Sequence, residues 1–201
     1  VLVDVVNGGG ALPTRNWSAG VFEGAENINS EAFQKIRIKK RACYQCSIGC
    51  RNFHGTTFAD KEVRGEGPEY ETIALCGANC GVDDIDGLMK FNELCDEYGL
   101  DTISAGSTTA LAMDMTEKGI HDFGVHFGRV EEYVKVPELI ATRQGIGAEL
   151  AEGTKALGEK YGHPELAIQV KGLEVPGYDP RGSFGSAISY ATSDRGGCHM
   201  R

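Results

Sequence analysis

The chain has 201 residues, 41% of them hydrophobic and 24% charged, which is ordinary for a soluble globular protein. Its net charge of −9 at pH 7 argues against nucleic acid as a general partner, because a surface that binds phosphates is usually basic. No apolar run approaches the ~20 residues that a membrane-spanning helix needs, so we expect no membrane partner.

The first part of the chain predicts two elements before its cysteines. Residues 1–6 indicate a short strand, which a loop containing glycine and proline follows. Ser30 is a typical N-cap, and the apolar residues after it share one face, so we expect a helix from Ser30 to Lys40. We therefore divide the chain into a lead-in of strand and loop, residues 1–28, and a helical domain, residues 29–201.

Cys43, Cys46 and Cys50 follow this helix with C-x2-C-x3-C spacing. Such short spacing lets three sulfurs converge on one centre, and thiolates are ligands of iron–sulfur clusters and of zinc. The flanking cations, among them Arg41 and Arg51, favour the thiolate form. The loop lacks a fourth ligand, so a metal site, a disulfide and buried thiols all remain open on spacing alone.

The chain has seven cysteines, an odd number, and nothing in it resembles a secretion signal. A disulfide framework would leave one thiol over. We therefore expect a cytoplasmic protein whose cysteines bind metal or pack in the core. Cys76, Cys80, Cys95 and Cys198 are expected to be small buried thiols.

The middle of the chain predicts a hairpin and then two long helices. Residues 52–66 are rich in β-branched and aromatic side chains around a turn at Ala59-Asp60. Residues 83–98 have an acidic start and one apolar face, and Gly99 suits the C-terminal cap of this helix. A second helix is expected over residues 101–119.

The rest of the chain predicts more helix than strand. Pro137 begins a third helix, which is expected to continue or to pause at Gly145 and Gly147 before it ends near residue 162. Short extended pieces then precede a short helix over residues 184–192. Helices outnumber the short strands, so the predicted fold class is mainly α, a multihelical domain with a few short β-strands.

Four sequence blocks, in order and spread over nearly the whole chain, carry a family resemblance. They are the cysteine loop over residues 43–50, GPEYET over 67–72, DEYGLDTIS over 96–104, and a segment over 178–199 that contains YDPRG and YATSDRGGCH. Together they resemble the tungsten- or molybdenum-containing aldehyde ferredoxin oxidoreductases. The resemblance implies a middle-domain fragment of a larger three-domain oxidoreductase, without its N-terminal β domain and its C-terminal domain.

The resemblance assigns the cysteine loop to an electron-transfer centre. It implies that Cys43, Cys46 and Cys50 bind a [4Fe–4S] cluster, with the fourth cysteine in the last domain, outside this chain. A structural zinc site is the alternative.

The resemblance also implies a pterin site. Asp96, Gly99, Leu100 and Asp101 match the family's D-x-x-G-L-D motif, which contacts one pterin of a tungstopterin or molybdopterin. Such a cofactor has two pterins per metal, and Mg²⁺ bridges the pterin phosphates. The alternative is a plain pair of helix caps, with Gly99 ending one helix and Asp101 beginning the next; both readings can be true.

Four further residues match positions beside the family's metal and are the candidate catalytic residues: Glu69, Glu71, Tyr178 and His199. Oxidation of an aldehyde needs a base that activates water and a donor that polarises the carbonyl group. A glutamate suits the first role, and His199 or Tyr178 suits the second. We expect one of the two glutamates to face the site and favour Glu71.

The function that follows is oxidation of aldehydes to carboxylic acids at the pterin-bound metal, with electrons passed through the cluster to ferredoxin. The expected partners are the aldehyde, ferredoxin, the remaining domains of the same protein and a second copy in a homodimer. Two alternatives stay open: a free-standing iron–sulfur or zinc protein with an electron-carrier or structural role, and the tungsten subunit of an aromatic-ring reductase. We expect the isolated fragment to be inactive.

Overall fold

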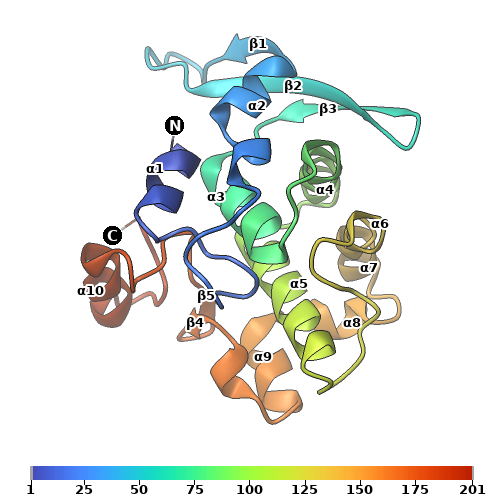
Figure 1. Cartoon of the computed structure of the whole chain (residues 1–201), viewed down its shortest axis with the longest axis vertical. Coiled ribbons are helices and arrows are strands. Elements are labelled where there is room, and N and C mark those ends of the chain that lie inside the picture. The colour runs from blue at the N-terminus through green and yellow to red at the C-terminus, as the bar shows by residue number, and fades with distance from the viewer. Residues whose placement is uncertain (1, 201) are drawn as a thin grey trace.

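The structure is a computed structural model that describes residues 2–200, and helices dominate it (Figure 1). The α-helices are α1 (Leu2–Gly8), α2 (Ser30–Lys35), α3 (Tyr70–Thr72), α4 (Ile85–Tyr98), α5 (Thr102–Glu117), α6 (Val130–Tyr133), α7 (Val136–Thr142), α8 (Gly147–Leu150), α9 (Gly153–Lys160) and α10 (Phe184–Thr192). The strands are β1 (Arg37–Arg41), β2 (Arg51–Phe58), β3 (Lys61–Glu66), β4 (Gln169–Val170) and β5 (Leu173–Glu174). The predicted fold class is confirmed.

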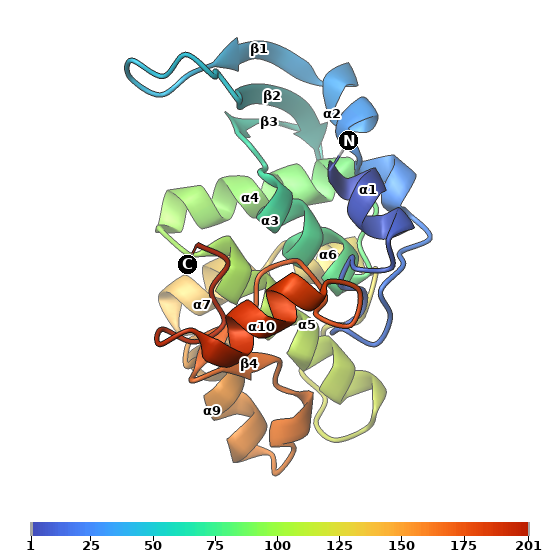
Figure 2. The same cartoon turned by 90° about the vertical axis from the view of Figure 1, so that its left-hand side faces the viewer.

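The core is built around α5, in which every residue from 105 to 115 is buried. This helix packs against α9 and against the π-helical turn Ile73–Gly77 that continues α3. Figures 1 and 2 show the β1–β3 sheet at one end of the molecule and α9 at the other, with α4 and α5 between them. A helix buried on all sides in this way fixes the position of its own N-terminus, where the candidate cofactor residues lie.

The connection between α4 and α5 follows the prediction closely. The Asp84 side chain accepts a hydrogen bond from the Gly87 N–H at 2.6 Å and caps α4. Gly99 ends that helix in the left-handed region, with φ +67°, which suits a residue without a Cβ. Asp101 then accepts a hydrogen bond from the Ser104 N–H at 2.8 Å and begins α5. The two predicted helices are confirmed.

The three strands β1, β2 and β3 form an antiparallel sheet in that order. The predicted hairpin turn is confirmed: Ala59 and Asp60, between β2 and β3, have φ of +47° and +61°. Strands β4 and β5 form a separate two-stranded hairpin.

The predicted helix over residues 30–40 is wrong in its second half. Helix α2 ends at Lys35, and its N-cap is Asn29, not Ser30, because the Asn29 side chain accepts hydrogen bonds from the N–H groups of Glu31 and Ala32 at 2.9 and 3.0 Å. Residues 37–41 form β1 instead, and all five are exposed. They carry no apolar stripe that could hold a helix against the core, so pairing with β2 determines their conformation.

The predicted strand over residues 1–6 is also wrong from Leu2 onward, because α1 occupies this stretch; residue 1 lies outside the described residues. Val3 and Val6 lie three positions apart and are both buried, which is a helical and not a strand spacing. In the loop that follows, Leu12 and Ile28 are fully buried in the same core as the later helices. The boundary between a lead-in and a domain at residue 28 stays a prediction.

The predicted helix from Pro137 to residue 162 consists of three helices, α7, α8 and α9. Arg143 and Gly145 interrupt it with φ of +54° and +53°, and Gly153 with φ of +85°. Left-handed residues end an α-helix, which explains the pauses. Among residues 2–200, no helix is both long and apolar enough to cross a lipid bilayer. The short helix predicted over residues 184–192 is confirmed as α10.

Candidate active site

The cysteine loop projects from the end of the β1–β2 pair, at the edge of the molecule (Figure 2). Cys43 and Cys50 are exposed, Cys46 is partly buried, and all three are free thiols. The backbone N–H groups of Ile48 and Gly49 hydrogen-bond Cys46 and hold the pKa of its thiol below the ordinary value. These two N–H groups therefore favour the thiolate at Cys46, which is the ligand form.

The three thiols share one loop, but the structure does not gather them. Among residues 2–200, no three His, Cys, Asp or Glu side chains are grouped closely enough to hold a metal ion. The donor set nevertheless has the right chemistry for an iron–sulfur cluster, because residues 43–50 contain three thiols and no His, Asp or Glu, and a cation lies beside them. The Arg51 Nη1 is 4.0 Å from the Cys43 Sγ.

A cleft of about 330 Å³ lies beside this loop and brings the candidate pterin residues together. Asp96 and Leu100 come from the end of α4, and Asp101 comes from the start of α5. Glu69 lines the same cleft, and so does Arg51, which follows Cys50 directly. The loop and the cleft are thus neighbours. Gly99 does not line the cleft, and its observed role is to end α4.

The polar groups of this cleft are only partly satisfied within the protein. One carboxylate oxygen of Asp101 caps α5, so the cap reading and a ligand role are compatible. The Asp96 carboxylate accepts a long hydrogen bond of 3.4 Å from Asn92, and burial raises its pKa while Arg51 opposes that rise. A row of acids and amides around an open cleft suits a hydrogen-bond-rich heterocycle such as a pterin.

Glu71, Tyr178 and His199 form a second group, close to the cleft. The Glu71 Oε1 lies 3.7 Å from the His199 Nε2, and the Tyr178 and His199 ring centroids are 6.3 Å apart. Next to Glu71, the Thr72 hydroxyl hydrogen-bonds the Thr102 hydroxyl at 2.8 Å, which ties α3 to the start of α5. The structure therefore brings three of the four candidate catalytic residues together.

The surroundings of Glu71 suit a proton acceptor. Burial raises the pKa of its carboxyl above the ordinary value, the Gly177 N–H and His199 oppose the rise, and Asp101 adds to it. The Oε2 accepts a hydrogen bond from the Gly177 N–H at 2.6 Å. The Oε1 is buried and has no hydrogen-bond partner among the described residues. A buried oxygen of this kind is costly unless it serves a ligand or a reaction.

Glu69 and Glu71 point to different places. Glu69 is exposed and lines the cleft with Asp96 and Leu100, whereas Glu71 lies with Tyr178 and His199. Of the two glutamates, the geometry favours Glu71 as the acid–base group.

Two residues that hold the Glu71 group in place were not predicted from the sequence. Tyr70 donates a hydrogen bond from its hydroxyl to the Gly177 carbonyl at 2.5 Å, and its ring lies 4.9 Å from that of Tyr178. Tyr70 stands inside the GPEYET block, but no local pattern links it to Gly177, 107 positions away.

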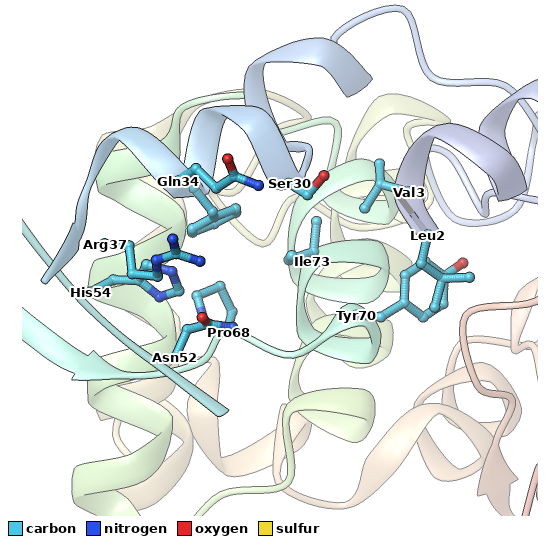
Figure 3. A pocket seen from close by; sticks show the side chains of 11 residues that line it. Leu2, Val3, Ser30, Gln34, Arg37, Asn52, His54, Pro68, Tyr70 and Ile73 are labelled. Carbon is cyan, nitrogen blue, oxygen red and sulfur yellow. The ribbon is translucent and has the colours of Figure 1, made fainter. Parts of the chain in front are cut away.

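Tyr70 also lines a separate pocket of about 190 Å³. Figure 3 shows Tyr70 and Leu2 at one end of this pocket, and Arg37 and His54 at the other, with Pro68 along its floor.

The four remaining cysteines are buried, as predicted. Burial raises the pKa of the Cys76 and Cys80 thiols, and that of Cys95 to about 12. Raised pKa values make these thiols inert at neutral pH, which fits core packing.

Comparison with known proteins assigns the chain to a family. A family model described as aldehyde ferredoxin oxidoreductase, domains 2 and 3, matches residues 1–201. The chain belongs to the aldehyde ferredoxin oxidoreductase family, and the predicted family is confirmed.

Two relatives carry the name tungsten-containing aldehyde ferredoxin oxidoreductase. The chain is 44% identical to the protein of Thermococcus kodakarensis over 214 residues and 43% identical to that of Pyrococcus furiosus over 209 residues. Each match covers 100% of this chain and 34% of the relative. The chain therefore spans about a third of the length of these relatives, as expected for part of a larger enzyme.

A solved structure shares the fold. The active-site complex BamBC of benzoyl coenzyme A reductase, bound to 1,5-dienoyl-CoA, matches with a TM-score of 0.69 and 22% identity. The match covers 92% of this chain and 29% of that one. At this identity the likeness concerns the fold alone.

Proposed function

We propose that the chain is the cofactor-holding part of a tungsten enzyme that oxidises aldehydes to carboxylic acids. The reaction is R-CHO + H₂O → R-COOH + 2e⁻ + 2H⁺, with both electrons leaving through a [4Fe–4S] cluster to ferredoxin. The observation that carries the proposal is the buried Oε1 of Glu71, which has no hydrogen-bond partner within residues 2–200 and lies 3.7 Å from His199 beside the cleft of Asp96 and Asp101. The names of the two relatives support the choice of metal and substrate.

Each member of the Glu71 group has a role that its surroundings support. Glu71 accepts the proton of the attacking water at Oε1, while the Gly177 N–H holds Oε2 in place. His199, which is partly exposed, donates a hydrogen bond to the carbonyl oxygen of the aldehyde and so polarises it. Tyr178 is the second candidate donor, at the side of His199.

The proposed cofactor sites are the two regions beside the Glu71 group, namely the cleft and the cysteine loop. The bound tungstopterin supplies the centre that accepts the two electrons. Asp96 and the backbone beyond Leu100 would hold one of its two pterins in the cleft, and Mg²⁺ would bind with the pterin phosphates. Cys43, Cys46 and Cys50 would hold the cluster together with a fourth cysteine from another domain. A molybdenum form would use the same protein residues.

The partners follow from these sites. The remaining domains of the same protein complete the cofactor site, and the isolated chain is inactive without them. The five exposed residues of β1, RIKKR, lie beside the cysteine loop and suit an acidic ferredoxin. A cytoplasmic location and a homodimer belong to the same proposal.

The test compares two glutamate variants of the full-length enzyme. Glu71→Gln keeps the shape of the side chain and the hydrogen bond from Gly177 but removes the base, so kcat should fall roughly 100- to 10,000-fold. Glu165→Gln is the matched control, because Glu165 also pairs with a histidine, His163, at 2.9 Å, but on the surface. The measurement is aldehyde-dependent dye reduction with iron and tungsten content determined on the same samples. A Glu71→Gln enzyme with the parent rate would contradict the proposal.

A further inference from the structure

Two consecutive side chains of α3 hold one residue from a distant part of the chain. The Tyr70 hydroxyl donates a hydrogen bond to the Gly177 carbonyl at 2.5 Å, and the Gly177 N–H donates one to the Glu71 Oε2 at 2.6 Å. From these contacts we propose that Tyr70 is a positioning residue that acts through Gly177 to fix the orientation of the Glu71 carboxylate. The inference rests on the proposed function, because it concerns the residue that accepts the proton.

The geometry leaves Gly177 little freedom. Both of its backbone polar groups are engaged: its N–H donates to Glu71 and its carbonyl accepts from Tyr70, so neither of the two peptide groups that flank its Cα can rotate without breaking a hydrogen bond. Burial raises the pKa of Tyr70, which keeps its hydroxyl protonated and able to donate. With Oε2 held in this way, Oε1 is the oxygen that remains on the side of His199.

Only a glycine fits between these two side chains. A Cβ at position 177 would lie 2.6 Å from the Cβ of Ala74 and 3.2 Å from the Glu71 Oε2. Gly177 is not in the left-handed region, so close approach and not backbone conformation explains the residue. The close approach is what allows both hydrogen bonds to form at 2.5–2.6 Å.

The Tyr70 side chain also contacts Tyr178, the residue after Gly177. Tyr178 follows Gly177, its ring packs 4.9 Å from that of Tyr70, and its carbonyl accepts a hydrogen bond from the Tyr190 hydroxyl at 3.3 Å. The Tyr70 ring keeps its packing, and its place at the end of the pocket in Figure 3, without the hydroxyl. Tyr70→Phe therefore removes one hydrogen bond and little else.

The experiment uses the full-length enzyme and the variant Tyr70→Phe. Loss of one hydrogen bond that orients a reacting group should lower kcat about tenfold, with KM changed less than about twofold. The iron and tungsten contents should equal those of the parent. Because the Gly177 N–H lowers the pKa of Glu71, a looser contact should also move the acidic limb of the kcat/KM profile to higher pH.

Tyr161→Phe is the matched control. The Tyr161 hydroxyl donates to the Glu149 Oε2 at 2.7 Å, just past α9, at the end of the molecule away from the β1–β3 sheet (Figure 1). The same chemical change there should leave kcat, KM and the pH profile as in the parent.

A double variant separates positioning from a general structural effect. In the Glu71→Gln background the base is already absent, so Tyr70→Phe should change the residual rate less than about threefold. The inference would be overturned if Tyr70→Phe lowered kcat tenfold both in the parent and in the Glu71→Gln background. Parent kinetics in Tyr70→Phe, or a loss of activity that parallels a loss of tungsten, would overturn it as well. A Glu71→Gln enzyme with the parent rate would instead refute the proposed function, and this inference with it.

Discussion

At the scale of single residues, the two oxygens of Glu71 have different surroundings. The Oε2 accepts the Gly177 N–H, while the buried Oε1 has no hydrogen-bond partner among the described residues. Burial raises the pKa of the carboxyl above its ordinary 4.5, which brings it closer to the range in which a general base works well. One residue therefore combines a fixed orientation with a tuned proton affinity.

The raised pKa of Glu71 predicts two pH effects of known sign. The carboxylate accepts a proton only above the raised pKa, so the acidic limb of kcat/KM should lie above pH 4.5 in the parent and be absent in Glu71→Gln. Because the folded pKa is above the unfolded one, the stability that Glu71 contributes is present below pH 4.5 and is lost as the pH rises through the folded pKa. Glu71→Gln should thus gain in melting temperature over the parent at pH 7 but not at pH 4. A Glu71→Gln variant that melts below the parent at pH 7 would refute the raised pKa of Glu71.

The residues of the site could be predicted only in part. Glu71, Tyr178 and His199 were identified through blocks that resemble a known family, not through any local spacing. Tyr70 and Gly177 were missed, because a contact across 107 positions depends on tertiary packing and leaves no mark in a local pattern. Glu69 and Glu71 flank the same tyrosine, and the sequence favoured Glu71; the structure adds that the two side chains have different neighbours.

At the scale of elements, the link between α4 and α5 places the cofactor residues. Gly99 ends α4 with φ +67°, and Asp101 caps α5, so Leu100 is held between two fixed helix ends at the cleft. Because α5 is buried along most of its length, this link has little room to shift. This rigidity fixes the shape of the cleft that we propose for a pterin.

Two glycine-to-alanine variants test this link. A Cβ would meet nothing within 4 Å at either Gly99 or Gly185, so only backbone conformation differs between the sites. Gly99→Ala puts a Cβ at φ +67° and should cost about 1–2 kcal/mol of unfolding free energy. Gly185→Ala, inside α10, should instead stabilise by about 0.5 kcal/mol. Denaturant unfolding measures both, and an equal effect at the two sites would contradict the account of this link.

Elements with local signals were predicted, and those without were not. The caps of α4 and α5, the turn at Ala59-Asp60 and the bounds of α10 all follow from nearby residues. Helix α1 and strand β1 were missed, because their sequences, rich in valine and in cations, are compatible with either helix or strand. Packing against the core determines the conformation of α1, and pairing with β2 determines that of β1.

At the scale of the whole molecule, the cysteine loop, the cleft and the Glu71 group adjoin one another in that order. The cysteine loop projects at the edge, Arg51 joins it to the cleft, and the Glu71 group lies next to the cleft. The chain as a whole has a net charge of −9, yet β1 and the residues around the loop are basic. This arrangement suits electrons that leave from an interior centre through the loop to an acidic carrier.

The chain spans about a third of the length of the relatives that it matches. Phe184 and Ile188 of α10 are 82% and 66% exposed, which is unusual for large apolar side chains on one helix. The proposed cofactor site, with its fourth cluster ligand, is a proposal for the full-length protein.

Metal analysis combined with electron paramagnetic resonance on the full-length protein, purified without air, tests whether the enzyme carries both the cluster and the pterin-bound metal. We expect about four iron atoms per tungsten or molybdenum and a signal from the reduced cluster that is lost in Cys46→Ala. Zinc as the only metal, with no pterin fluorescence after denaturation, would contradict it, and the three loop cysteines would then have a structural role.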